Sequence, residues 1–459
     1  MQKRAVSPQH RCRDRPLIAI LICVLAFGAA LFVGRRSFAW GLGTVIGIGY
    51  VYGITRANIL QPASHVIFDV AVIGLYLSQL RPSGHRRPPV PMGIKVWVIL
   101  LMAWPTVLLF TSDIDLLVGI VGWRANVFLL PFILLGSWMS DDDARHMGSV
   151  VAALNVAALL MAVVQFVVGI EPFFPQSAVT EIIYKSKDLV DRTAYRIPST
   201  FSSAHAFGGT MVLSIPWLVG LWTQRNRGRW ETYLAGAGLF AAFVGVFMAA
   251  ARTHMISLAV LVVVITLSGQ LWARNWARWL VVVAAVAWLV AGDARLQRFA
   301  TLRDTEFISE RIVDSVNSEF FDLLGEYPMG NGLGTGVGTS MPYFLEDRAP
   351  AQKGLENEYA RIAVETGIPG LFIWGLFVAW VLTRRGRPRA DSWSLASRVT
   401  RAAAATSFLF GLTGTGLLTS VPQTALLMLS IGWFAVGGTG THAETGADDV
   451  ELAEDPSAA

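Results

Sequence analysis

The sequence has few charged residues for its length. Only 15% of its 459 residues are charged, 54% are hydrophobic, and the mean hydropathy is +0.51. Soluble domains carry roughly 25% charged residues, so the composition indicates an integral membrane protein. The apolar runs, about 17–24 residues each, are too long for transmembrane strands of about 10. We therefore predict an all-α fold, a polytopic bundle of transmembrane helices.

Cysteine and clustered metal ligands are also scarce. Cys12 and Cys23 are the only cysteines, which excludes a disulfide scaffold and a cysteine zinc site. His205 and His254 are isolated histidines with no second ligand at a useful spacing. We expect no metal and no cofactor. The formal charge of +5 lies mainly in short loops, which reflects membrane topology and gives no reason to expect a nucleic-acid partner.

About thirteen apolar runs can be read along the chain. They fall near residues 16–34, 38–53, 64–80, 94–111, 115–138, 147–169, 205–222, 232–250, 254–269, 276–292, 366–383, 402–420 and 422–438. Short basic loops between runs lie on the cytoplasmic side. These loops are 81–89, 223–229, 273–278 and 384–389. They place the polar stretches 170–204 and 293–365 outside.

The N-terminal end does not fit this alternation. A basic tail precedes the first run without a clear cleavage site, so we expect a retained anchor and no signal peptide. Thirteen spans would place that tail outside. We therefore expect one early run, near Arg35 and Arg36, to be re-entrant or merged, which leaves about twelve spans with both ends inside.

Four regions follow from this topology. They are the helices of 1–292 with the smaller outer loop 170–204, the large extracytoplasmic loop 293–365, the C-terminal helices of 366–440 and a disordered acidic tail over 441–459. The large loop holds a four-residue apolar period that predicts an amphipathic helix over 306–325. A glycine-alternating run follows at 330–338, where Gly332 and Gly334 let the backbone turn beside a ligand or another helix.

Several charges fall near membrane depth. Arg124 lies inside an apolar run and Arg252 lies at an outer turn. An intramembrane charge is costly unless it faces a cavity or a partner, and arginine holds phosphate in a bidentate fork. Arg196 and the Ser/Thr residues after it can meet a sugar or phosphate, or cap the next helix. Asp69 is expected to be a structural carboxyl or the partner of a basic group.

A helix beginning near residue 356 carries a second polar group. Glu356, Asn357 and Arg361 share one face, and Glu358 is spaced to form a surface ion pair with Arg361. Glu356 has no such partner at i+4, and a carboxylate at the membrane edge can serve as a general base.

The order of these motifs identifies a family. Residues 196–201 read R-x-x-S-T-F, Arg252 follows in a short turn, 328–334 read P-x-G-x-G-x-G, and N-x9-G-x-x-G begins at Asn357. Over about residues 115–440 the chain resembles the O-antigen ligase and O-antigen polymerase superfamily of bacterial envelope polysaccharide enzymes.

The resemblance implies a metal-independent glycosyltransferase of the GT-C type in the bacterial inner membrane. It would transfer an undecaprenyl-pyrophosphate-linked oligosaccharide to an acceptor hydroxyl on the outer face, within membrane lipid and together with other polysaccharide-assembly proteins. Glu356 stands where the ligase motif has histidine, which favours a polymerase over a ligase. A transporter or flippase of the lipid-linked precursor is the alternative from another class.

The expected site combines both arguments. Its catalytic residues are Glu356, Asn357 and Arg252. Its candidate substrate-binding residues are Arg124, Arg196, Arg361, Gly332 and Gly334.

The assignment of Glu356 as the base that activates the acceptor can be tested directly. A positioned general base contributes about 10²–10⁴-fold to rate, so Glu356→Gln should lose activity by that order and still bind the lipid donor. Chain extension by the purified protein in liposomes measures the loss. Turnover within a few-fold of wild type would remove the role.

Overall fold

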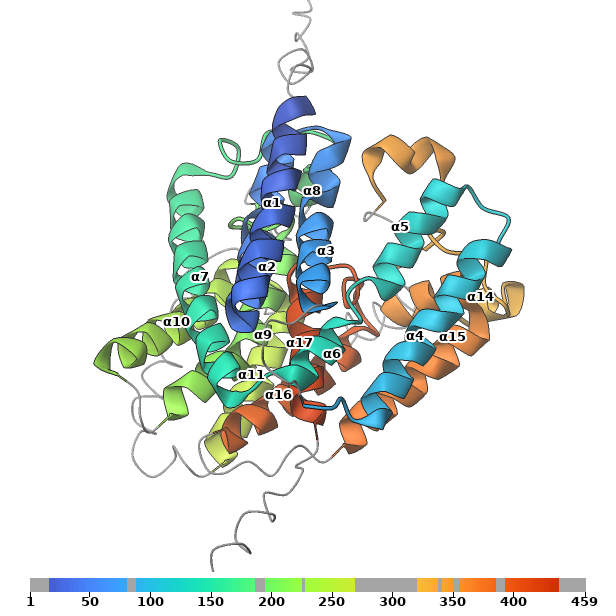
Figure 1. The fold of residues 1–459 in the computed structure, drawn as a ribbon. Coiled ribbons are helices and arrows are strands. Elements are labelled where there is room, and N and C mark those ends of the chain that lie inside the picture. The colour runs from blue at the N-terminus through green and yellow to red at the C-terminus, as the bar shows by residue number, and fades with distance from the viewer. Residues whose placement is uncertain are drawn as a thin grey trace, which may run out of the picture.

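Helices account for all regular secondary structure in the part of the chain that the structure describes. The structure is a computed structural model, and it describes residues 16–80, 88–185, 195–224, 228–268, 320–336, 341–349, 355, 357–384 and 393–436. The helices form one bundle (Figure 1). The expectations for the run 276–292, for most of the amphipathic helix over 306–325, for Glu356 and for the acidic tail concern residues outside this part.

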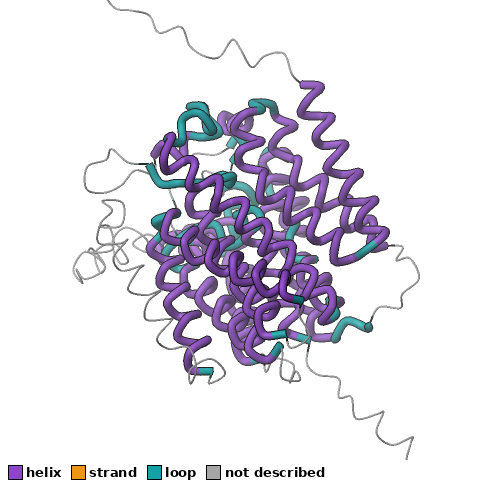
Figure 2. The backbone as a smooth tube through the Cα atoms, turned by 90° about the vertical axis from the view of Figure 1, so that its left-hand side faces the viewer, coloured by secondary structure: helices purple, strands orange, loops and turns teal. Residues whose placement is uncertain are grey.

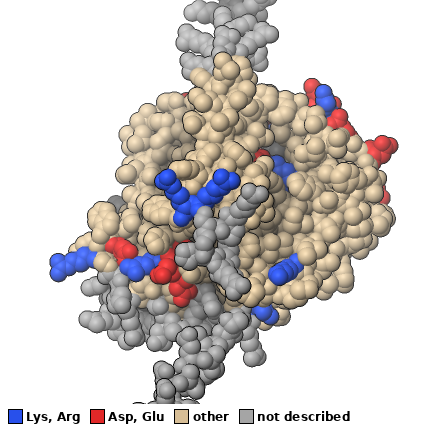
Figure 3. Space-filling view, in the orientation of Figure 1, with Lys and Arg blue, Asp and Glu red and all other residues tan. Residues whose placement is uncertain are grey.

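Nine helices in the described ranges are long and apolar enough to cross a membrane. They are α1 (Pro16–Arg36), α2 (Phe38–Asn58), the unit of η2 (Pro62–Val66) and α3 (Ile67–Leu80), α4 (Met92–Thr111), the unit of α5 (Leu116–Val127) and α6 (Phe132–Trp138), α7 (Asp141–Val168), α9 (Ala204–Thr223), α10 (Arg229–Met248) and α15 (Glu358–Thr383). The chain is therefore a multi-pass membrane protein, as its composition predicts. Figure 3 shows a surface on which charged side chains are sparse.

Further helices are shorter. These are α8 (Glu181–Lys185), α11 (Arg252–Leu267), α14 (Phe320–Glu326), η6 (Tyr343–Arg348), α16 (Ser394–Phe410) and α17 (Gln423–Ala435). Figure 2 shows that some loops lie within the bundle and not only at its ends. Such non-helical backbone is tolerated at membrane depth where protein or a cavity surrounds it.

The expectation that two early runs are merged is wrong. α1 and α2 are separate helices of 21 residues each, about 31 Å long and enough to span the hydrocarbon. Ser37 divides them, because its side chain caps α2 by accepting a hydrogen bond from the Trp40 amide. The pair Arg35–Arg36 ends α1, so the basic residues mark a turn between two spans.

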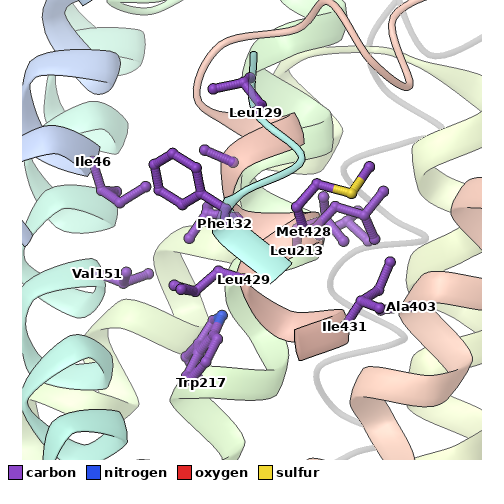
Figure 4. Close-up of a cluster of buried hydrophobic side chains, with 14 of the residues drawn as sticks. Ile46, Leu129, Phe132, Val151, Leu213, Trp217, Ala403, Met428, Leu429 and Ile431 are labelled. Atoms are coloured by element: carbon purple, nitrogen blue, oxygen red, sulfur yellow. The ribbon is translucent and has the colours of Figure 1, made fainter. Parts of the chain in front are cut away.

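α9 is the centre of the bundle. Of its most apolar stretch, 94% is buried inside the protein. Trp217 of α9 is fully buried and lies 5.4 Å, centroid to centroid, from Trp433 of α17. Figure 4 shows Trp217 among apolar side chains of several helices, including Phe132 of α6 and Leu429 of α17.

The closest helix crossing joins α6 and α17. A Cβ atom added at Gly136 would overlap the carbonyl oxygen of Leu429, and one added at Gly432 would overlap that of Ile133. Small residues permit such close approach between membrane helices, where packing and not the hydrophobic effect drives association. The two glycines therefore set the position of α17.

α15 is broken within its first half. Gly367 has a φ of 69° inside the helix, and Pro369 follows. The turn segment 328–331 contacts the break. The Ile368 amide donates to the Pro328 carbonyl at 2.9 Å, and the Asn331 amide donates to Val364 at 2.6 Å. The short helix and following span predicted around residue 367 are both confirmed.

The α6–α17 crossing predicts the effect of one methyl group. Gly136→Ala should destabilise the protein by about 1–3 kcal/mol, because overpacking forces the two backbones apart. Gly28→Ala is the matched control, since Gly28 is also in a membrane helix and an added Cβ meets nothing within 4 Å. Thermal unfolding in detergent measures both variants, and equal melting temperatures would contradict the crossing.

Candidate functional site

A cavity of about 530 Å³ opens among the ends of several helices. Its walls come from the last turn of α2, from α5, from the segment 196–205, from the first turns of α9 and α11, and from the segment 407–423. The stretches 196–204 and 251–254, both predicted to be outside, therefore meet at one site. Figure 3 shows the surface hollowed between α3 and α5, with basic and acidic atoms in the recess.

Four arginines line this cavity. They are Arg56, Arg124, Arg196 and Arg252, and each is half-buried. No carboxylate is among the described residues that line it. A partly buried positive charge destabilises a membrane protein unless an anion or a protein partner compensates for it. The cavity therefore has the electrostatics of an anion site.

The structure brings together three arginines that the sequence singled out and adds a fourth. Arg124, Arg196 and Arg252 lie in one cavity although they are far apart in the chain. Sequence reasoning missed Arg56, whose guanidinium lies 5.5 Å from the centroid of the Tyr52 ring. One feature of the sequence could have identified it: Arg56 follows the apolar run 38–53 by about one turn, at an end that the predicted topology places outside.

The guanidinium groups keep donors for a ligand. Arg124 is held by Asp69, with 2.5 Å between Nε and Oδ2. Asp69 is thereby confirmed as the partner of a basic group. The terminal amino groups of Arg124 make no hydrogen bond within the described ranges. The buried Nε atoms of Arg56 and Arg196 also have no partner there, so several N–H groups can meet an incoming anion.

Hydroxyl groups line much of the remaining wall. Ser203 accepts from the Ala206 amide at 3.1 Å and caps α9, and it also lines the cavity, as Ser202 does. The two predicted roles of this cluster are therefore compatible. Opposite α9 lies the segment 411–422, which we call the Gly–Thr loop. Its cavity-lining residues are Gly411, Thr413, Gly414, Thr415, Gly416, Leu417, Thr419, Ser420 and Val421.

The short helix α8 closes part of the outer side. Ile182 lines the cavity, and the Tyr184 hydroxyl donates to the carbonyl of Phe174. Burial, followed by the charge of Glu171, raises the pKa of Tyr184. The hydroxyl therefore stays protonated and remains a hydrogen-bond donor, which fixes α8 over the site.

Two histidines lie in the same cavity. The rings of His205 and His254 are 4.3 Å apart between centroids. Across the described ranges, no three His, Cys, Asp or Glu side chains gather in an arrangement that could hold a metal ion.

Arg361 is placed away from the cavity lining. Its side chain is 1% exposed and lies between two carboxylates: Nη2 is 2.8 Å from Glu358 Oε1, and Nη1 is 2.8 Å from Glu365 Oε2. The predicted pair of Glu358 and Arg361 exists but is buried, so the surface reading was wrong. We call Glu358, Arg361 and Glu365 the triad. Their i, i+3 and i, i+4 spacing places them on one side of α15.

The triad connects two walls of the cavity. Glu358 Oε2 accepts from the Gly416 amide of the Gly–Thr loop at 2.8 Å. Glu365 accepts from Asn126 of α5 at 2.6 Å, two residues after Arg124. Arg361 therefore bears on the cavity through its neighbours, and the structure gives it no direct contact with a substrate there.

The other predicted residues have packing roles. Asn357 is buried and caps α15 by accepting from the Tyr359 amide at 2.8 Å. Gly332 and Gly334 have φ values of 95° and 89°. Gly332 lies against Ile114 just before α5, and Gly334 packs against α5, where a Cβ atom added at Gly122 would overlap the Gly334 backbone. Of the two expectations for these glycines, close approach to another helix is the one observed.

Comparisons with known proteins find no match: no protein-family model matches the chain, and no curated protein is significantly similar to it. The resemblance to O-antigen ligases and polymerases therefore stays a prediction.

The triad predicts a large stability difference between two ion pairs. Removing one partner of a buried pair costs about 3–5 kcal/mol, so Arg361→Met, which leaves two carboxylates face to face, should melt far below wild type. The control is Arg145→Met, which breaks a half-exposed pair with Glu231 worth about 0–1 kcal/mol. Thermal unfolding in detergent compares them, and equal losses would show that the triad does not hold α15.

Proposed function

We propose that the chain is a glycosyltransferase of the bacterial inner membrane that polymerises oligosaccharide repeat units carried on a polyprenyl diphosphate. One observation carries the proposal: a cavity among the helix ends lined by four arginines and no carboxylate of the described chain. A lipid-linked diphosphate is an anion that reaches such a cavity from the membrane. The polysaccharide assignment itself comes from the motif resemblance.

The arginines suit the departure of a diphosphate. In the transfer, the acceptor hydroxyl oxygen forms a bond to the anomeric carbon while the bond from that carbon to the phosphate oxygen breaks. Negative charge then grows on the leaving diphosphate. Guanidinium groups aimed at that charge stabilise the transition state more than the ground state. The acceptor proton passes to a base, for which the sequence proposes Glu356.

The cavity size sets what enters it. Small-molecule sites enclose about 300–1,000 Å³, and about 530 Å³ accommodates a diphosphate with one or two sugars. The rest of the repeat unit must extend outside the cavity. The apolar lining formed by Val212, Leu213 and Phe410 suits the first part of the prenyl chain.

A transporter of the same lipid is the second candidate. The break between α5 and α6 and the short α17, which begins at the cavity, are helix interruptions of the kind found at transporter sites. A reconstituted transporter would move the donor across the bilayer and leave its glycosidic bonds unchanged. An enzyme would release polyprenyl diphosphate.

The arginines predict a graded loss of activity. Arg196→Ala should reduce chain extension by about 10²–10³-fold, as removal of a transition-state donor does. Arg196→Lys should recover only part of it, because the ammonium lacks the planar fork. Arg398, exposed on α16, provides the control Arg398→Ala, which should extend chains at the wild-type rate. Normal product from Arg196→Ala would remove the arginine from the site.

The glycan that accumulates on the lipid carrier in cells lacking the protein decides between polymerase and ligase. Single repeat units indicate a lost polymerase. Long polymer indicates a lost ligase.

A further inference from the structure

The amide of Gln423 is buried at the cavity without a hydrogen-bond partner. Gln423 is 6% exposed, is the first residue of α17 and lines the cavity. Its Oε1 atom is buried and has no hydrogen-bond partner among the described residues. A buried, unsatisfied amide destabilises a protein by about 1–3 kcal/mol. An apolar side chain of the same shape would be more favourable unless something binds the amide.

A second polar residue of the cavity lining also has one unpaired, buried atom. His254 is 7% exposed, lines the cavity, and has a buried Nε2 atom with no partner in the described chain. We call Gln423 and His254 the polar floor. Gln423 and His254 are therefore two polar side chains of the cavity lining, each with one atom that the described chain leaves unpaired.

Adjacent glycines of α9 make room for the floor. A Cβ atom at Gly208 would lie 3.0 Å from His254 Cδ2, and one at Gly209 would overlap the Gln423 amide. Gly209 is five residues into α9, about 7.5 Å along the helix axis. Packing against α9 therefore holds both side chains of the polar floor in place.

The floor differs from the arginines in charge. A glutamine amide offers one acceptor and two donors, and an imidazole offers one acceptor or donor at Nε2. This set matches the neutral hydroxyls of a sugar, whereas the guanidinium groups match the diphosphate. A site built to hydrogen-bond a hydroxyl rejects analogues that lack it, because its own groups are then left unpaired.

We propose that Gln423 and His254 bind hydroxyl groups of the sugar next to the diphosphate and thereby select the donor. The proposal rests on the proposed function, because it assumes that the arginines hold the diphosphate. It makes Gln423 a specificity-determining residue of the same site.

The test begins with the melting temperature of the ligand-free protein. If Gln423 has a structural role, replacing it lowers this temperature; if it has a binding role, replacing it leaves the temperature unchanged or raises it. Without ligand, Gln423→Leu should melt at or above the wild-type temperature, because it removes an unpaired buried amide. Gln165→Leu is the matched control. Gln165 is also buried and has an unpaired Oε1, but its Nε2 donates to the Ser199 carbonyl at 2.7 Å, so its loss should lower the melting temperature. A fall for Gln423→Leu as large as that of the control would overturn the proposal.

Binding then identifies the ligand group. The probes are farnesyl diphosphate and the same lipid carrying one glucose, galactose or N-acetylglucosamine. Wild type should bind at least one glycosylated probe more tightly than farnesyl diphosphate. Gln423→Leu should lose roughly tenfold of that preference, about the value of one neutral hydrogen bond, with unchanged affinity for farnesyl diphosphate. Gln423→Met repeats the test if the leucine variant does not fold.

The outcomes separate the two proposals. If wild type binds farnesyl diphosphate but no glycosylated probe more tightly, or if both Gln423 variants keep the preference, the floor does not bind sugar and the proposed function stands. If wild type binds none of the lipid diphosphates, the proposed function fails and the sugar assignment fails with it.

Discussion

The buried ion triad of α15 is the interaction on which the site depends. Two carboxylates and one guanidinium, all nearly inaccessible to solvent, satisfy one another within a single helix. The two remaining oxygens accept from the Gly416 amide at 2.8 Å and the Gly336 amide at 3.2 Å, and Asn126 donates a second hydrogen bond to Glu365 Oε2 at 2.6 Å. A buried charge group is stable only when such bonds are complete. The triad therefore fixes α5, the Gly–Thr loop and the glycine-rich segment relative to α15.

The site built on this support combines positive and neutral polar groups. Arginines from α2, α5, α11 and the segment before α9 line the cavity together with hydroxyl groups and the Gln423 amide. Arg124 is paired with Asp69, which compensates for one of the four positive charges. A bound anion would complete the electrostatics, which connects the stability of the cavity with its occupancy.

How much the sequence could predict differs between residues for physical reasons. A charge near membrane depth needs a cavity or a partner, and both Arg124, predicted inside an apolar run, and Arg252, predicted at an outer turn, line the cavity. Spacing along a helix cannot tell a buried ion pair from an exposed one, so Arg361 was assigned to substrate and its pair to the surface. Hydropathy predicted the bundle, but it assigned residues 411–420 of the Gly–Thr loop to the apolar run 402–420, so this part of the cavity wall was missed. Gln423 carried no signal, because only the tertiary contacts show that its amide is unpaired.

The crossing of α6 and α17 also has a consequence for biosynthesis. α6 leaves the ribosome early, whereas α17 is the final helix of the described chain, and their backbones meet at Gly136 and Gly432. Until α17 is inserted, the face of α6 that carries Gly136 lacks the helix against which it packs. The same last segment supplies the Gly–Thr loop and Gln423. A nascent chain interrupted before residue 411 would thus reach the membrane with most of its spans, yet without a closed cavity, so partial products stay inert.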